Sequence, residues 1–275
     1  MKDGLLNYKN SEISYCRFGS GLKPVLCFHG YGEEASSFEF LGNNTGEEFS
    51  FYAVDLPFHG KTQWNESLPL TNIDLLQIIE ELLVENNHKL QTTNHKLVLL
   101  GFSLGGRIAL SLYQAIPERI EKLVLLAPDG LKVNFWYWLA TQTWLGKNLF
   151  AFTMKHPSWF FGFLNILNKL RLVNASVYKF VSYYIDDKEA RMLLYNRWIT
   201  LRKIKPGITQ IKSFIQRYKT PVRLVYGKHD RIILASVGEK FRKGIEEQCS
   251  ITIIHSGHQV LHEKHITEIL PILLG

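Results

Sequence analysis

One short segment carries a serine between glycines, at the point where a predicted strand becomes a predicted helix. The segment reads Gly101-Phe102-Ser103-Leu104-Gly105; the apolar run 96–100 precedes it and the helical pattern 104–115 follows it. A serine on such a turn needs small neighbours, because the backbone bends sharply there and projects the hydroxyl above the sheet. The start of the helix also favours negative charge that develops at the hydroxyl. The pattern therefore predicts that Ser103 is a nucleophile.

Histidines gather after the last predicted strand. In the segment His255-Ser256-Gly257-His258, the glycine allows a loop from which the imidazole of His258 can reach over the sheet edge. We predict that His258 is the general base. His262 and His265 fall in the pattern of the final helix. A metal site of His258, His262 and His265 is a weaker interpretation, because no cluster of acidic ligands accompanies them; we expect no metal and no cofactor.

Two aspartates compete for the role of orienting that histidine. Asp230 follows the predicted strand 222–226 in the turn Gly227-Lys228-His229-Asp230, and Asp129 follows the predicted strand 123–126. An acid at either strand end can hold an imidazole in the correct tautomer. We predict that Asp230 is the orienting acid and keep Asp129 as the alternative.

A glycine-rich loop follows an early strand, in the segment His29-Gly30-Tyr31-Gly32. The backbone N–H groups of Tyr31 and Leu104 would together form an oxyanion hole. His29 is predicted to be structural or to contact the substrate, and not to be catalytic. Arg107 lies one helical turn after the serine, so it either binds a substrate anion or forms a structural ion pair.

Strand-like runs and helical patterns alternate along most of the chain. The runs predicted as strands are 5–8, 12–18, 24–28, 51–54, 96–100, 123–126, 222–226 and 251–254. The first two form a hairpin, and the helical patterns lie at 71–86 (with Thr71 as a candidate N-cap), 104–115, 235–247 and 260–274. This alternation predicts an α/β fold with a mainly parallel sheet flanked by helices. Residues 131–215 interrupt it, so we predict a core of residues 1–130 and 216–275 with a helical cap inserted after the sixth strand.

The predicted cap is basic and aromatic. It holds 13 Lys and Arg against 3 Asp and Glu, whereas the whole chain of 275 residues has a net charge of only +7. Five of the six tryptophans also lie there: Trp136, Trp138, Trp144, Trp159 and Trp198. The cap is expected to line an apolar pocket for the acyl part of a small-molecule substrate. A basic rim touching an anionic membrane is a further interpretation, and no nucleic-acid partner is expected.

Cellular location is suggested by what the chain lacks. The three cysteines lie far apart and form no CxxC pair, and the first ten residues show no apolar run of signal-peptide length. No apolar stretch is long enough to span a bilayer. We expect a cytoplasmic protein.

The chemistry-bearing residues occur in the order Ser103, Asp230, His258, and with these motifs the chain resembles the α/β-hydrolase family. The matching segments are 29–30, 55–60, 101–106, 227–230 and 257–258. The resemblance implies an eight-stranded sheet, a catalytic triad of these three residues, and a structural loop at 55–60, where the family usually has glycine in place of Phe58.

The resemblance also implies a serine hydrolase acting through an acyl-enzyme, with a carboxylic ester (EC 3.1.1) as the expected substrate. The Gly105-Gly106-Arg107 sequence is similar to that of menaquinone-pathway lyases of the same fold. A lyase or a carbon–carbon bond hydrolase that binds a substrate carboxylate with Arg107 is therefore the alternative. A hydrolase-fold receptor for a small molecule is a third interpretation.

Overall fold

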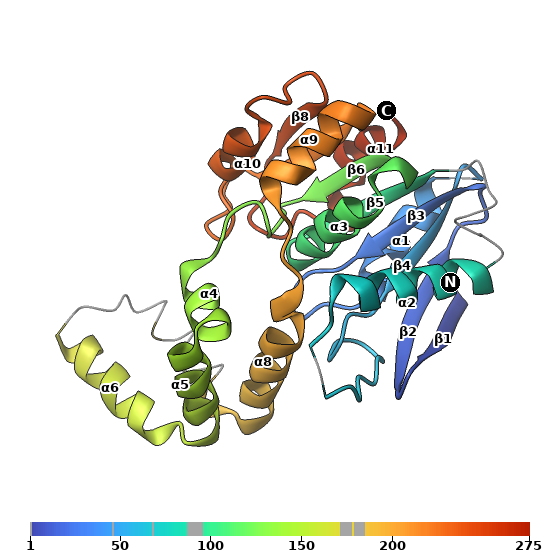
Figure 1. Ribbon diagram of the computed structural model, residues 1–275. Helices are drawn as coiled ribbons and strands as arrows, with labels where there is room; N and C mark the ends of the chain where they lie inside the picture. The colour runs from blue at the N-terminus through green and yellow to red at the C-terminus, as the bar shows by residue number, and fades with distance from the viewer. Residues whose placement is uncertain (1, 46, 68, 87–95, 171–177, 179–184) are drawn as a thin grey trace. The chain divides into compact units, whose positions relative to one another are not determined.

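The computed structural model describes residues 2–45, 47–67, 69–86, 96–170, 178 and 185–275 (Figure 1). The strands are β1 (Lys2–Tyr8), β2 (Ser11–Phe18), β3 (Lys23–Phe28), β4 (Phe49–Val54), β5 (Leu97–Phe102), β6 (Ile120–Leu126), β7 (Val222–Gly227) and β8 (Cys249–Ile254). The α-helices described are α1 (Glu39–Asn44), α2 (Asn72–Glu85), α3 (Leu104–Ala115), α4 (Phe135–Gln142), α5 (Trp144–Lys155), α6 (Ser158–Lys169), α8 (Lys188–Thr200), α9 (Ile208–Tyr218), α10 (Ala235–Arg242) and α11 (Ile266–Leu274).

All eight strands belong to one sheet in the order β1-β2-β4-β3-β5-β6-β7-β8. The hairpin of β1 and β2 pairs antiparallel, β2 also pairs antiparallel with β4, and the other neighbours are parallel. The predicted eight-stranded, mainly parallel sheet is therefore confirmed. Because β5, β6, β7 and β8 are parallel neighbours, the loops after them meet at one edge of the sheet.

Helices cover both faces of this sheet. Along β3, Val25 and Cys27 pack in a cluster with residues of α1 and α11 such as Leu41 and Ile269. Alternate residues of a strand point to opposite faces, so the neighbours of these two residues lie under the other layer, in which α3 contacts both α2 and α9 (Figure 1). Cys27 is fully buried in this core.

The start of α2 is fixed by its own sequence. The Thr71 side chain accepts a hydrogen bond from the Asp74 N–H at 3.2 Å, and the Asp74 carboxylate accepts one from the Thr71 N–H at 2.9 Å. This reciprocal capping box satisfies two N–H groups that have no partner within the helix. The predicted N-cap at Thr71 is confirmed.

Two predicted helices are shorter than expected. The helix predicted at 235–247 ends at Arg242, two residues before Gly244, which has φ +85° and turns the chain toward β8. The helix predicted at 260–274 begins only at Ile266, since His262 is extended and its ring accepts the N–H of Lys264 to cap a short 3-10 turn. The placement of His262 and His265 within that α-helix was therefore wrong.

The chain forms two compact units, residues 1–132 with 203–275 and residues 133–202. The sequence-based boundary at 215 is too late, because α9 contacts α3 in the larger unit and buries Ile211 and Ile215 completely. Within the smaller unit, the ring of Phe150 on α5 packs against Tyr195 and Trp198 on α8, with centroids 5.4 Å apart in each case. None of the helices described here is long and apolar enough to cross a membrane.

Candidate active site

Ser103 lies between β5 and α3 in a conformation that L-residues rarely adopt. Its backbone has φ +50° and ψ −115°, and such strain costs of order 1–3 kcal/mol. The strain is maintained by hydrogen bonds on both sides, from the Ser103 N–H to the Leu126 carbonyl (2.9 Å) and from the Gly106 N–H to the Ser103 carbonyl (2.9 Å). A Cβ atom on Gly105 would overlap the Phe28 carbonyl, so the turn can pack against β3 only with glycine there.

The three residues expected to form a triad come together. His258 Nε2 lies 3.0 Å from Ser103 Oγ, and His258 Nδ1 lies 2.8 Å from Asp230 Oδ2. The Asp230 side chain is completely buried, and its other oxygen accepts the N–H groups of Ile232 (2.7 Å) and Ile233 (3.0 Å). A carboxylate held in this way orients the imidazole, so that Nδ1–H donates to Asp230 and the Nε2 lone pair faces the serine.

The rival aspartate has different partners. Asp129 Oδ2 lies 2.7 Å from Arg107 Nη2, and Asp129 Oδ1 accepts the N–H of Gly130 at 2.7 Å. Its backbone N–H donates to the Ser103 carbonyl at 2.8 Å. Asp129 therefore supports the serine turn, and Arg107 occupies the structural ion pair that was one of its two predicted roles.

The residues predicted for the oxyanion hole lie at the ends of β3 and β5. Leu104 is the first residue of α3, so its N–H has no acceptor within the helix. Tyr31 lies three residues after β3, with its ring edge against His59 at a centroid distance of 5.8 Å. The assignment of these two N–H groups to an oxyanion hole stays a prediction.

His29 connects two loops from a fully buried position. Its Nδ1 lies 2.8 Å from the Gly30 carbonyl, and its Nε2 accepts the N–H of Leu56 at 3.1 Å. Both ring nitrogens thus bond to backbone groups of the protein. This arrangement supports the structural role expected for His29 and speaks against substrate binding.

The loop at 55–60 is also held by buried hydrogen bonds. The two carboxylate oxygens of Asp55 accept the N–H groups of Ala35 (2.7 Å) and Lys61 (3.1 Å). Phe58 has φ +61°, the left-handed conformation that favours glycine. The glycine that the family usually has at this position therefore corresponds to a backbone requirement, which this chain meets with a phenylalanine.

Glu33 and Gln259 adjoin the site but were missed in the sequence. Glu33 Oε1 accepts the side-chain amide of Gln259 at 2.7 Å, and Oε2 accepts the Gly30 N–H at 3.3 Å. Burial raises the pKa of Glu33, although these two hydrogen bonds and the nearby His258 oppose the rise. The pair links the loop of Tyr31 to the loop of His258. In the sequence, this pair was indicated only by position: Glu33 follows the glycine-rich loop, and Gln259 follows the predicted base.

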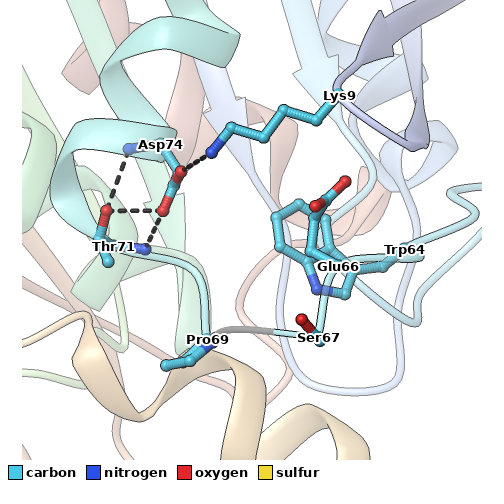
Figure 2. Close-up of a pocket in the computed structure, with 7 residues that line it drawn as sticks. All are labelled: Lys9, Trp64, Glu66, Ser67, Pro69, Thr71 and Asp74. Atoms are coloured by element: carbon cyan, nitrogen blue, oxygen red, sulfur yellow. Dashed lines mark hydrogen bonds and ion pairs between the residues drawn. The ribbon is translucent and has the colours of Figure 1, made fainter.

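Clusters of metal ligands and pockets are two further features that bear on ligand binding. Among the residues described, no three His, Cys, Asp or Glu side chains gather as a metal site. Figure 2 shows a pocket lined by Lys9, Trp64, Glu66, Ser67, Pro69, Thr71 and Asp74. No member of the Ser103, Asp230 and His258 cluster lines it, and the dashed contacts there are those of the α2 cap and the ion pair of Lys9 with Asp74.

The family model for the alpha/beta hydrolase fold matches residues 23–265. The chain belongs to the alpha/beta hydrolase fold family. The match includes Ser103, Asp230 and His258, and it agrees with the family resemblance of the sequence motifs.

Known proteins of this family extend the comparison. The chain is 22% identical over 265 residues to a pimeloyl-[acyl-carrier protein] methyl ester esterase of Hamiltonella defensa, covering 93% of each protein. It is 24% identical over 280 residues to a 2-hydroxy-6-oxononadienedioate/2-hydroxy-6-oxononatrienedioate hydrolase of Cupriavidus pinatubonensis, covering 94% of this chain and 88% of the relative. A solved esterase structure from Thermogutta terrifontis aligns with a TM-score of 0.68 and 16% identity over 100% of this chain and 98% of that one. The alpha/beta hydrolase fold and the hydrolase relatives together indicate an enzyme of the hydrolase class that acts on a small molecule.

Proposed function

We propose that this alpha/beta hydrolase is a serine hydrolase that cleaves a carboxylic ester or a related acyl bond. The observation that carries the proposal is the continuous hydrogen-bonded chain from Asp230 through His258 to Ser103, with distances of 2.8 Å and 3.0 Å. A nucleophile, a base within hydrogen-bond reach and a third group that orients the base are what acyl transfer to a serine requires. The methyl ester esterase among the relatives supports the same reaction class.

In the proposed mechanism, His258 Nε2 takes the proton of Ser103 Oγ as this oxygen attacks the substrate carbonyl. The imidazolium that forms is stabilised by the Asp230 carboxylate, whose other oxygen accepts the N–H groups of Ile232 and Ile233. The N–H groups of Leu104 and Tyr31 stabilise the negative oxygen of the tetrahedral intermediate. His258 then protonates the leaving alcohol, and a water that it activates hydrolyses the acyl-enzyme. No cofactor takes part in these steps.

The acyl part of the substrate is proposed to be apolar. The smaller unit is rich in aromatic side chains, and apolar side chains predominate in the pockets that bind small molecules. The name of the Hamiltonella defensa relative specifies a pimeloyl ester, whose acyl group is much longer than acetate. We therefore expect a preference for medium-length acyl chains.

A carbon–carbon bond hydrolase or a lyase is the second candidate. The Cupriavidus pinatubonensis relative acts, by its name, on a dienedioate, and a dianionic substrate would need a cation such as Arg107. The ion pair of Arg107 with Asp129 at 2.7 Å argues against this use of the arginine. A receptor without activity is a third candidate, disfavoured because a receptor does not need the hydrogen-bonded geometry of Ser103 and His258.

The decisive experiment combines labelling with a substrate series. A fluorophosphonate should label the wild type and not Ser103→Ala, and p-nitrophenyl esters from two to eight carbons should show kcat/KM rising with length. Each buried CH₂ is worth about 0.8 kcal/mol, or up to about fourfold in kcat/KM. Absence of labelling would reject the nucleophile. Labelling without turnover of any ester would favour the second candidate, and a flat length profile would remove the apolar acyl site.

A further inference from the structure

Helix α6 carries an exposed apolar stripe. Trp159, Phe163, Ile166 and Leu170 follow one another at intervals of four, three and four residues, and they are 39%, 49%, 57% and 62% exposed. This spacing places all four side chains on one face of a helix. Leu164, outside the stripe, is instead buried. The exposed stripe and the buried Leu164 are therefore different parts of the surface of α6.

Helix α5 likewise has one buried face and one exposed face. Phe150 packs against aromatic rings of α8, and Met154 is 3% exposed. On the outer side, Trp144, Leu145 and Phe152 are 76%, 70% and 52% exposed. The buried face of α5 contributes to the core of the smaller unit. Packing within this unit therefore does not explain why the exposed face is apolar. We call the exposed apolar side chains of these two helices the α5–α6 apolar surface.

The smaller unit, which carries this surface, is mainly basic. Residues 133–202 contain nine Lys and Arg against three Asp and Glu, and the acids Asp186, Asp187 and Glu189 lie together at the start of α8. Lys155 and Lys169, at the ends of α5 and α6, are exposed. A second copy of the chain docked on the same surface would bring like charges together, which opposes self-association. A lipid surface with anionic headgroups complements both features, because it accepts aromatic side chains at the level of the headgroups and attracts lysines.

From these observations we infer that the α5–α6 apolar surface binds peripherally to an anionic membrane, with Trp144, Phe163 and Ile166 at the boundary of headgroups and acyl chains and Lys155 and Lys169 facing lipid phosphates. This inference goes beyond the proposed ester hydrolysis and does not depend on it. It also names the residues responsible for the membrane contact that the basic, aromatic composition suggested.

The test is co-sedimentation with vesicles of phosphatidylcholine alone or with about 30 mol% phosphatidylserine, whose anionic headgroups give the surface a negative potential that attracts Lys and Arg. The protein is Ser103→Ala, so that the result is independent of any lipid hydrolysis. We expect binding to the anionic vesicles at low salt, at least about tenfold weaker binding to neutral ones, and loss of binding at about 0.5 M salt, where charges are screened. Tryptophan emission should shift to the blue on binding.

Two variants locate the contact. Phe163→Ser/Ile166→Ser and Lys155→Glu/Lys169→Glu should each weaken binding by about tenfold or more. Ile73→Ser is the matched control, since Ile73 is a 71% exposed apolar residue on α2 of the larger unit, and it should bind as the parent does. Circular dichroism and thermal unfolding verify that each variant is folded.

Three outcomes would overturn the inference. These are absence of binding to anionic vesicles at low salt, binding that Phe163→Ser/Ile166→Ser leaves unchanged, and equal affinity for neutral and anionic vesicles. A concentration-dependent dimer in analytical ultracentrifugation that the same double variant abolishes would instead assign the surface to a second copy of the chain.

Discussion

Arg107 Nη2 lies 2.7 Å from Asp129 Oδ2, so the candidate substrate-binding arginine and the alternative orienting acid are paired with each other. The arginine side chain is 12% exposed and the aspartate side chain 30%. Because the Asp129 N–H also donates to the Ser103 carbonyl, the pair braces the turn on which the proposed nucleophile lies. This one contact therefore bears both on the role of Arg107 and on the choice between Asp129 and Asp230, which the sequence left open.

The first prediction ranks the two aspartates. Asp230→Asn should lower kcat by about 10⁴-fold, the loss expected when an amide stabilises the wrong imidazole tautomer. Asp129→Asn should change kcat far less, because its contacts are with Arg107 and Gly130 and not with the base. Steady-state kinetics on one good ester, with thermal unfolding as the check on folding, compares the variants. A larger loss in Asp129→Asn would assign the orienting role to Asp129.

The second prediction separates a structural from a substrate-binding Arg107. Arg107→Ala should lower the free energy of unfolding by about 1–3 kcal/mol, since it leaves the Asp129 carboxylate without its cation. The double variant Arg107→Ala/Asp129→Ala should be destabilised by less than the sum of the single variants. KM should change equally for neutral esters and for esters with a free carboxylate. A rise in KM confined to carboxylated substrates would favour the second candidate function.

The third prediction concerns pH and Glu33, whose pKa burial raises despite hydrogen bonds from Gln259 and Gly30 and the nearby His258. A carboxyl with a raised pKa in the folded state stabilises the fold below its unfolded pKa of about 4.3, and this contribution is lost as the pH rises through the folded pKa. Glu33→Gln removes this titration. The Tm difference, variant minus wild type, should therefore become more positive between about pH 4.5 and pH 8. A difference independent of pH would show that Glu33 titrates as it does in water.

The fourth prediction concerns the cap of α2. Asp74 accepts hydrogen bonds from Thr71, Tyr8 and Lys9, and although burial alone would raise its pKa, these bonds lower it below its usual range. A depressed pKa stabilises the fold above the unfolded value of about 3.9 and loses this effect as the pH falls through the folded value. Asp74→Ala should lower the free energy of unfolding at pH 7 by about 1–2 kcal/mol, and by less as the pH falls below about 4.

Activity and a second aspartate provide the controls for this variant. The kcat of folded Asp74→Ala should equal that of the wild type, because Asp74 lies in the pocket of Figure 2 and not beside Ser103. Asp3→Ala, which removes an exposed ion pair with Lys61, should leave stability nearly unchanged. Urea denaturation at several pH values measures the stability of both variants. Equal effects of the two substitutions would argue against the capping box.

The position of Ser103 could be predicted from the sequence because its determinants are local. An apolar run, a serine flanked by glycines and a helical pattern occur within twenty residues, and the strand–turn–helix geometry follows from them. The sheet was predicted for a related reason: strand–helix alternation leaves few topologies besides a parallel sheet with helices on both faces. The ends of the last helices were less predictable, since one depends on the turn at Gly244 and the other on a cap formed by the His262 ring.

The sequence favoured Asp230 as the orienting acid but left Asp129 open as the alternative. Asp129 and Asp230 follow β6 and β7, which are adjacent parallel strands, so both reach the same edge of the sheet. Which carboxylate meets His258 depends on the path of each loop and on Arg107, which pairs with Asp129. Only the folded backbone decides such a difference, because it amounts to a few ångströms between side chains far apart in the chain.

The order and type of the elements and the position of the proposed nucleophile were thus predictable from the sequence alone, through hydrophobic periodicity and local turn chemistry. The partners of each polar group were decided by the tertiary structure. Glu33 and Gln259 are separated by 226 positions, yet their side chains lie 2.7 Å apart beside the proposed base. No periodicity relates two such residues, since a contact of this kind arises only when the sheet brings the loops after β3 and β8 to one edge.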